Sequence, residues 1–349
     1  MTKKRGDGEL IQVSELPLMK QLAKKYARPT RAQNALVDAV LSIQAAPDAV
    51  EWGFMARQLI LCTLPHSDPG NIDAWTRRTG SIALGIQPGV DFDTGRKIGY
   101  PYGTIPRLLL FWITTEVQRV KKLPELSITQ KRTLQLGHNL AAFMEAVGLN
   151  PRGGGKRSDA KRLHDQMDRL FSSRIGFVEK KQDGSAIGKE RGSMEISPHY
   201  ELWWNKKQPG QGTLWNSHVF LGEGFYNALV DCAVPVDMRA LKALKKSPLA
   251  LDLYAWICYA AFAIVQQKRA PQFVPWKSLM QQFGTDYTGP SAVKNFKTHV
   301  KAALRKIAGN GSGRSGLYPG LTIKPSRGGF SLHATRLAVP QQSSGKALA

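Results

Sequence analysis

Apolar residues recur at every third or fourth position near the C-terminal end of the chain, over residues 291–307. This period is typical of an amphipathic helix, whose apolar face would comprise Val293, Phe296, Val300, Leu304 and Ile307. Two short runs of alternating polarity follow, at residues 320–324 and 330–334. Gly328 and Gly329 lie between the runs and are expected to supply the positive φ angles of a tight turn. The pattern predicts a helix followed by a β-hairpin, which is the outline of a winged helix.

The first half of the chain repeats this order of patterns. A short helix is predicted at residues 139–147, an amphipathic helix at residues 157–171, and extended runs at residues 174–181 and 193–200. The apolar positions of the two helices match those of the second half at a nearly constant spacing. A polar segment rich in Gly and Pro, residues 205–213, separates the two halves. Duplication of one winged-helix unit explains this order better than chance does.

These patterns predict an α+β fold that is mainly helical, with two tandem winged-helix domains that each carry a β-hairpin wing. A small sheet region is also expected within residues 52–100, where Gly and Pro are frequent and apolar positions alternate in places. The predicted organisation is a basic, partly disordered tail (1–30), an N-terminal winged-helix domain (31–207), a C-terminal winged-helix DNA-binding domain (208–338) and a flexible tail (339–349).

Charge narrows the choice of partner. The 349 residues include 49 Lys and Arg against 26 Asp and Glu, which gives a net charge of +23. Such an excess favours a polyanion, because each phosphate that a basic side chain neutralises releases condensed counterions. A solvated basic face on an ordinary helix is the simpler alternative. No Asp or Glu occurs from Tyr287 to the C-terminus, and this absence favours nucleic-acid binding.

A membrane surface is the rival anionic partner, but the chain has no uncharged apolar run of 18 residues. The most apolar stretch, residues 248–266, contains Asp252 and is expected to be a buried core helix. The first residues lack the apolar segment of a signal peptide, so we expect a cytoplasmic protein without a membrane partner. Three cysteines, Cys62, Cys232 and Cys258, are far apart and are expected to be reduced core residues.

Catalytic signatures are weak throughout the chain. The glycine-rich segment before residue 157 is not a phosphate-binding loop for ATP, because Lys156 is followed by Arg157 instead of Ser or Thr. The seven histidines have no metal-ligand spacing, and Cys-x-x-Cys is absent. Carboxylates are too scattered for a two-metal nuclease. The prediction is a protein that is not an enzyme, with no catalytic residues, metal or cofactor.

The candidate DNA-binding residues are therefore basic or polar side chains on the two predicted helices and hairpins. A recognition helix enters the major groove while a wing contacts an adjacent groove or the backbone. Lysines are expected to bind phosphates, whereas Ser291 and Asn295 lie in the part of a helix that reads bases. In the first half the candidates are Lys156, Arg157, Lys161, Arg169, Lys189 and Arg191, the last two in the predicted hairpin loop. In the second half they are Ser291, Lys294, Asn295, Lys297, Lys301, Arg305 and Arg327.

Several longer strings of residues resemble one protein family, the plasmid-encoded RepA replication initiators. In the first half these are YPYGTIPRLLL at residues 100–110, the Trp-Ile-Thr-Thr-Glu run at 112–116, FMEAVGL at 143–149, and shorter strings at 154–157 and 163–167. In the second half they are PVDMRALKAL at residues 235–244 and SPLALDLYAW at residues 247–256. The resemblance extends over roughly residues 50–335 and leaves out the first 30 residues.

The resemblance implies an initiator that binds repeated sites in double-stranded plasmid origin DNA through tandem winged helices. It also implies recruitment of the host initiator DnaA and the replicative helicase, and a possible homodimer. A transcriptional regulator with the same two modules is the alternative, and an origin-nicking or ATP-using enzyme is a third, disfavoured one. Because Asp165 and Asp168 interrupt the basic face of the first helix, we expect the second unit to anchor DNA more strongly. A C-terminal piece that begins near residue 209 is then expected to bind DNA alone.

Overall fold

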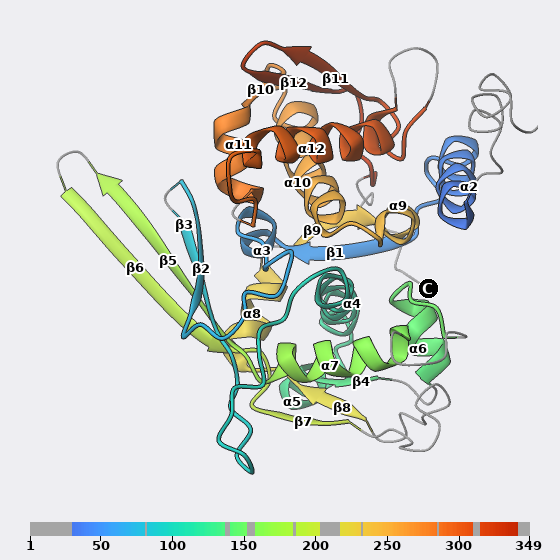
Figure 1. The fold of residues 1–349 in the computed structure, drawn as a ribbon. Helices are drawn as coiled ribbons and strands as arrows, with labels where there is room; N and C mark the ends of the chain where they lie inside the picture. Colours follow the sequence, from blue (N-terminus) through green and yellow to red (C-terminus); the bar gives the residue numbers. More distant parts are fainter. Residues whose placement is uncertain are drawn as a thin grey trace, which may run out of the picture.

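The computed structural model describes residues 30–340, apart from residues 81, 137–139, 152–157, 184–185, 203–216, 232, 285 and 310–314. It confirms the predicted α+β fold, mainly helical, with two winged-helix units (Figure 1). In each unit a long buried helix supports an amphipathic helix, and a β-hairpin follows that helix in the chain. Cys62 and Cys258 are buried and free, while Cys232 lies outside the described residues.

The first unit is built around α4 (Ile105–Val120), which begins with Pro106 in its first turn and buries most of its side chains. The amphipathic helix α7 (Asp159–Phe171) packs on α4 with its apolar stripe, which includes Leu163, Met167 and Leu170. Ser158 caps α7 by accepting a hydrogen bond from the backbone nitrogen of Lys161. The other helices are α5 (Ile128–Arg132), α6 (Leu140–Ala146) and α8 (Glu223–Asp231).

Two antiparallel sheets complete this unit. The larger sheet has the order β2-β3-β5-β6, with β2 (Trp75–Thr79), β3 (Ile82–Gln87), β5 (Arg174–Asp183) and β6 (Ala186–Glu195). The smaller sheet has the order β4-β8-β7, with β4 (Thr133–Gln135), β8 (His218–Phe220) and β7 (His199–Glu201). Strands β5 and β6 form a long arm that projects from the body (Figure 1).

The arm corrects the predicted position of two candidate residues. Strands β5 and β6 stay paired as far as Asp183 and Ala186, so only two residues connect them. Lys189 and Arg191 are therefore strand residues of β6, whereas the sequence pattern placed them in a hairpin loop. The sequence pattern missed this continuation because backbone hydrogen bonds between antiparallel strands do not depend on an alternation of apolar side chains.

The second unit is built around α10 (Pro248–Val265). This is the one described helix long and apolar enough to cross a membrane, and most of it is buried inside the fold. The amphipathic helix α12 (Ala292–Ala308) packs on α10. The remaining elements are α9 (Met238–Leu244), α11 (Trp276–Phe283) and a sheet of order β10-β12-β11, formed by β10 (Gln272–Pro275), β11 (Leu321–Ser326) and β12 (Gly329–Ala334).

The two units share a continuous core. Strand β1 (Trp52–Ala56) pairs antiparallel with β9 (Ala233–Asp237), and each strand leads directly into a helix. Helix α2 (Arg31–Ala45) packs on α9, and α3 (Arg57–Leu61) packs on α10. Segments from the predicted N-terminal domain thus lie against the second unit, and one cluster of buried residues extends through both. A boundary near residue 207 does not separate two independent cores.

A buried ion pair crosses between the units. Arg107 on α4 is 2% exposed, and it donates from Nε and Nη2 to the two carboxylate oxygens of Asp252 on α10, at 2.8 and 2.9 Å. The remaining guanidinium hydrogens are donated to the backbone carbonyls of Leu64, Pro65 and Gly103. Burial alone would raise the pKa of Asp252, but the charge of Arg107 and the hydrogen bond with His66 hold it well below its usual range.

His66 extends this pair into a network. Its Nε2 lies 2.8 Å from the Asp252 carboxylate, and its backbone nitrogen donates to Asp286 at 3.0 Å. Asp286 is also paired with the buried Arg77 at 3.2 Å. Burial lowers the pKa of His66 because it penalises the charged imidazolium, and together with the positive charges of Arg107 and Arg77 it outweighs the hydrogen bond and charge of Asp252, which act in the opposite direction. We therefore assign a neutral His66 in the folded protein.

This assignment predicts acid sensitivity. Unfolded His66 binds a proton below about pH 6.5, and the folded form binds it only at lower pH, so stability is lost as pH falls through that value. From pH 7.5 to pH 5.5 the free energy of unfolding should fall by up to about 1.4 kcal/mol through this residue. Denaturant unfolding at both pH values measures the effect. His66→Gln should remove it, and the exposed His299→Gln should not. Equal pH dependence in wild type and His66→Gln would contradict the assignment.

Candidate nucleic-acid interface

Helix α12 presents one apolar face and one basic face. Phe296, Val300, Leu304 and Ile307 are buried, and Gly309 ends the helix with φ +82°. Val293 is 53% exposed, in contrast to the sequence-based expectation, because it lies in the first turn beyond the buried stripe. Among the predicted candidates on this helix and at its start, Lys297 is half-buried and the others are exposed: Ser291, Lys294, Asn295, Lys301 and Arg305.

The wing follows this helix in the chain, and its first strand, β11, contacts the helix. Strands β11 and β12 pair from Leu321 to Ser326, and the exposed Arg327 lies at the connection between them. Neither Gly328 nor Gly329 has a positive φ, so the predicted reason for these glycines is wrong. The backbone of β10 instead approaches so closely that a Cβ atom on Gly329 would collide with the carbonyl oxygen of Val274. Close strand packing, and not turn conformation, requires this glycine.

This close approach makes a prediction for the wing. Gly329→Ala should destabilise the chain by about 1–3 kcal/mol, because β10 or β12 must move to admit the methyl group. Gly328→Ala is the matched control, since its Cβ atom would meet only Phe273 at 3.7 Å, and a change within about 0.5 kcal/mol is expected. Thermal or denaturant unfolding of both variants decides the matter. Similar stabilities of the two variants would contradict the proposed contact.

A groove of about 780 Å³ lies between α12 and the wing. Trp276, at the start of α11, forms part of its wall and packs edge-on against Phe330, with ring centroids 5.5 Å apart. The ammonium groups of Lys297 and Lys301 lie 5.8 and 5.9 Å from the Trp276 ring centroid. Cation–π attraction to one ring therefore holds two positive charges at the groove. Arg305 and Arg327 also line it.

Trp276 was not among the sequence-based candidates. Its position in the repeat matches an apolar position of the first unit that the sequence predicts to be buried, so the sequence signal indicated only packing. The basic residues of the groove have no ion-pair partner in the part of the chain that the structure describes. The sequence has no carboxylate after Asp286. The groove-lining basic residues, together with the exposed Lys294 and Lys324 on the same helix and wing, are here called the α12–wing surface: Lys294, Lys297, Lys301, Arg305, Lys324 and Arg327.

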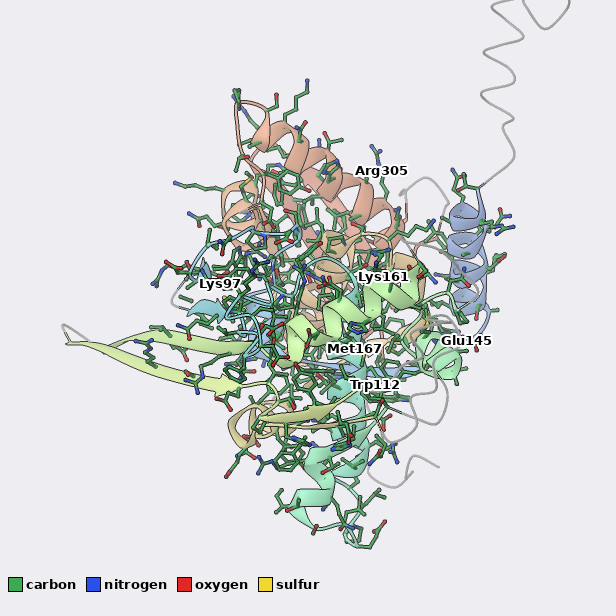
Figure 2. The ribbon with its side chains drawn as sticks, turned by 60° about the horizontal axis from the view of Figure 1, so that its bottom comes forward. Lys97, Trp112, Glu145, Lys161, Met167 and Arg305 are labelled. Carbon is green, nitrogen blue, oxygen red and sulfur yellow. The ribbon has the colours of Figure 1, made fainter. Side chains whose placement is uncertain are left out.

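The basic residues of α7 in the first unit are less available for binding DNA than those of α12. Lys161 is exposed, as expected. Arg169 is half-buried and lies 3.1 Å from both Asp68 and Asp165, with its guanidinium 5.3 Å from the ring centroid of Tyr102. These contacts tie the 65–70 loop to α7, so we remove Arg169 from the proposed interface. Figure 2 shows Lys161 on α7 and Arg305 on α12. Lys156, Arg157 and the side chain of Lys189 lie outside the described residues.

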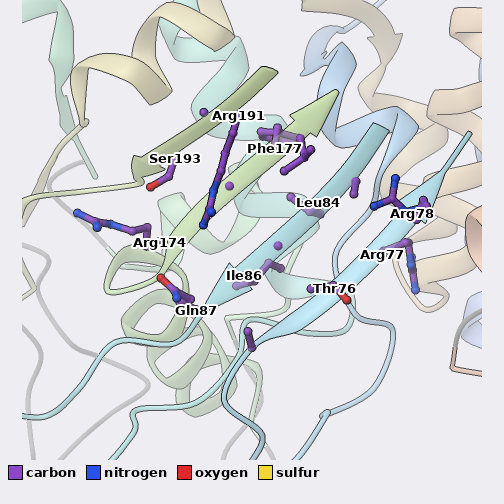
Figure 3. Close-up of a pocket in the computed structure, with 16 residues that line it drawn as sticks. Thr76, Arg77, Arg78, Leu84, Ile86, Gln87, Arg174, Phe177, Arg191 and Ser193 are labelled. Atoms are coloured by element: carbon purple, nitrogen blue, oxygen red, sulfur yellow. The ribbon is translucent and has the colours of Figure 1, made fainter. Parts of the chain in front are cut away.

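The sheet of the first unit carries a second group of basic residues. Arg191 is exposed on β6 and lines a shallow hollow of about 350 Å³. Figure 3 shows Arg191, Arg174 and Arg78 around this hollow, each from a different strand. Arg174 is engaged with Glu195 at 2.7 Å. Arg78 and Arg174 were not predicted as candidates, because only the pairing of β2, β3, β5 and β6 brings them to one face.

Comparisons with known proteins add one family and two structures. The model of the family described as plasmid encoded RepA protein matches residues 100–278. A crystal structure of domains 2 and 3 of RctB, as the selenomethionine derivative, has a TM-score of 0.43 at 12% identity and covers 78% of this chain and 95% of that chain. A second structure of RctB domains 2–3 has a TM-score of 0.42 at 10% identity, with coverages of 79% and 94%. A search of curated protein sequences gave no match.

Proposed function

The chain belongs to the family of plasmid-encoded RepA proteins, and we propose from this premise that it initiates plasmid replication by binding double-stranded origin DNA. The observation that supports the proposal most strongly is the α12–wing surface. It combines an amphipathic helix, a wing with Arg327 at its connection and a groove with clustered positive charge, and the sequence provides no carboxylate there. A helix and wing of this kind can contact the phosphates that border one groove of a DNA duplex.

In the proposed complex α12 lies in the major groove. Ser291 and Asn295, at its N-terminal end, are in position to contact base edges, and Lys297 and Lys301 contact phosphates. Arg305 and Arg327 extend these contacts along the groove and the wing. Helices α7 and α12 both run across the near side of the molecule in Figure 1. Lys161, Arg191 and Arg78 of the first unit are therefore proposed as a second, weaker set of contacts.

Family membership supports three further elements of the proposal. The initiator would act in the bacterial cytoplasm, it would recruit host DnaA and the replicative helicase, and it would form a homodimer at some stage. We also propose that it works by binding alone, without a catalytic centre. The division of labour predicted from the sequence remains part of the proposal: the second unit anchors DNA, and the first contributes modest base contacts, dimerisation or both.

Footprinting on the parental plasmid tests the function. An initiator should protect several directly repeated sites beside an AT-rich tract, and Lys297→Ala/Lys301→Ala should lose that protection. Deleting the coding sequence should stop replication of the plasmid. Protection confined to a promoter, with replication intact after the deletion, would identify a transcriptional regulator and contradict the proposal.

A further inference from the structure

A loop with an exposed aromatic residue at its tip projects from the first unit. Residues 88–99, here called the finger, connect β3 to α4 and extend from the lower end of the molecule in Figure 1. Phe92 is 98% exposed, the highest value of any large apolar side chain in the described ranges. Val90 is 45% exposed, and Ile72, whose carbonyl accepts a hydrogen bond from Lys97 at the base of the finger, is 40% exposed. Grouped exposed apolar residues mark contact sites on soluble proteins.

The finger has a fixed conformation. One carboxylate oxygen of Asp91 accepts hydrogen bonds from the backbone nitrogens of Asp93 and Thr94, at 2.9 and 3.0 Å. The backbone of Asp91 bonds to that of Gly95 and Arg96, both at 2.8 Å. Gly95 has φ +68°, which favours glycine at this turn. Hydrogen bonds from Thr94 and Asp93 outweigh a small effect of burial and lower the pKa of Asp91. A tip ordered in advance loses little entropy when it binds.

The two carboxylates beside Phe92 disfavour DNA as the partner of the finger's tip. Asp91 and Asp93 flank Phe92, whereas Arg96 and Lys97 follow the tip, so the finger as a whole has no net charge. On the neighbouring loop, Asp68 is paired with Arg169 and Asp73 with Lys97. Phosphates would be repelled by carboxylates placed on both sides of the tip. A partner for this tip needs an apolar cavity with a basic rim.

This chain itself provides such a cavity, here called the α10 cavity. It has a volume of about 240 Å³, sufficient for one aromatic ring, and is lined by apolar residues of β9, by Tyr259 and Phe262 of α10 and by residues 337–339. Phe262 is 43% exposed. Arg57 is exposed at the rim and has no ion-pair partner within the described part of the chain. We propose that Phe92 of one copy inserts into the α10 cavity of a second copy, with Asp93 facing Arg57.

Such a contact joins two different surfaces, so it can link copies that share one orientation head to tail. Copies bound at directly repeated sites share one orientation, which suits this geometry; this step rests on the proposed function. One side chain in one cavity is far below the area of a stable interface. The contact therefore operates between copies already held on neighbouring DNA sites, where the effective concentration reaches the millimolar range.

Binding to origin fragments with one site or with two directly repeated sites tests the proposal. Wild type should fill the second site about tenfold more tightly than a lone site. Phe92→Ala should bind the single site as wild type does and lose this cooperativity. Leu41→Ala, which removes another exposed apolar side chain (63% exposed) on α2, should keep it. Unchanged cooperativity in Phe92→Ala overturns the proposal, and so does weaker single-site binding, because the finger would then contact DNA.

A charge exchange identifies the receiving surface. Asp93→Lys and Arg57→Glu should each reduce cooperativity, and the double variant should restore it. Asp93→Cys and Arg57→Cys add a direct readout when each also carries Cys258→Ala, because the free Cys258 lines the cavity. An interchain disulfide should then form on two-site DNA only when the two variants are mixed. Failure of the double variant to recover, or a disulfide from one variant alone, overturns the assignment of the α10 cavity. Absence of single-site binding by wild type would instead contradict the proposed function.

Discussion

Replacing Asp252 with asparagine is expected to remove about 3–5 kcal/mol from the free energy of unfolding of the full chain. Arg107 would then keep its charge at 2% exposure, with backbone carbonyls and a neutral amide oxygen in place of its carboxylate partner. A buried charge that loses its counter-ion keeps its desolvation cost and loses the attraction that offset it. Since domains of this size are stable by about 5–15 kcal/mol, the variant should lose a large share of its stability.

Denaturant unfolding of Asp252→Asn against wild type measures this loss. Glu195→Gln is the matched control, because its pair with Arg174 is as short, at 2.7 Å, but both side chains are about half exposed. The control should change stability by no more than about 1 kcal/mol. Replacing both buried partners, in Arg107→Met/Asp252→Leu, should recover much of the loss. Equal effects of Asp252→Asn and Glu195→Gln would show that the buried network between the units contributes no more to stability than an exposed ion pair does.

Lys297→Ala/Lys301→Ala should weaken binding to every duplex sequence and lower the dependence of log K on log salt by about two units. Both ammonium groups lie beside Trp276 at the groove, so each is placed for one phosphate. Each phosphate contact contributes a slope of about 0.9. Because phosphate contacts carry no sequence information, cognate and unrelated DNA should lose affinity together.

Titration of labelled duplexes between about 50 and 200 mM salt tests this result. Lys306→Ala is the matched control on the same helix: Lys306 is exposed but does not line the groove. It removes the same charge, so it reports the effect of net charge alone. A slope that falls equally per lysine in Lys306→Ala and in the double variant would mean that the α12–wing surface is only a solvated basic face.

The shared core changes one expectation drawn from the sequence. A piece that begins near residue 209 was expected to bind DNA alone. In the structure it would lack β1, which pairs with β9, and Arg107, which neutralises the buried Asp252. Loss of DNA binding by that piece would therefore report unfolding as readily as the position of the interface. Substitutions in the full chain separate these two effects.

The local elements were predictable because their signals lie within a few residues of each other. The apolar period at residues 291–307 predicted α12 to within one residue at each end, and the apolar stretch at 248–266 predicted α10 as a buried core helix. The basic character of the C-terminal segment was predictable too, because the absence of carboxylates after Asp286 is a property of the sequence and does not depend on the fold. The family resemblance rested on contiguous strings and was confirmed by the match over residues 100–278.

The sequence by itself thus determined the principal helices, the C-terminal hairpin, the excess of positive charge and the family, whereas the bounds of the first hairpin came only from the strand pairing. Tertiary structure alone decided which charges are available. Arg169 and Lys161 are both basic residues of α7, yet Arg169 is held by Asp68 while Lys161 is exposed. Arg107 and Asp252 are 145 positions apart and form one buried pair, and Trp276 gathers two lysines from another helix. These contacts depend on packing between distant segments, which no local period or composition encodes.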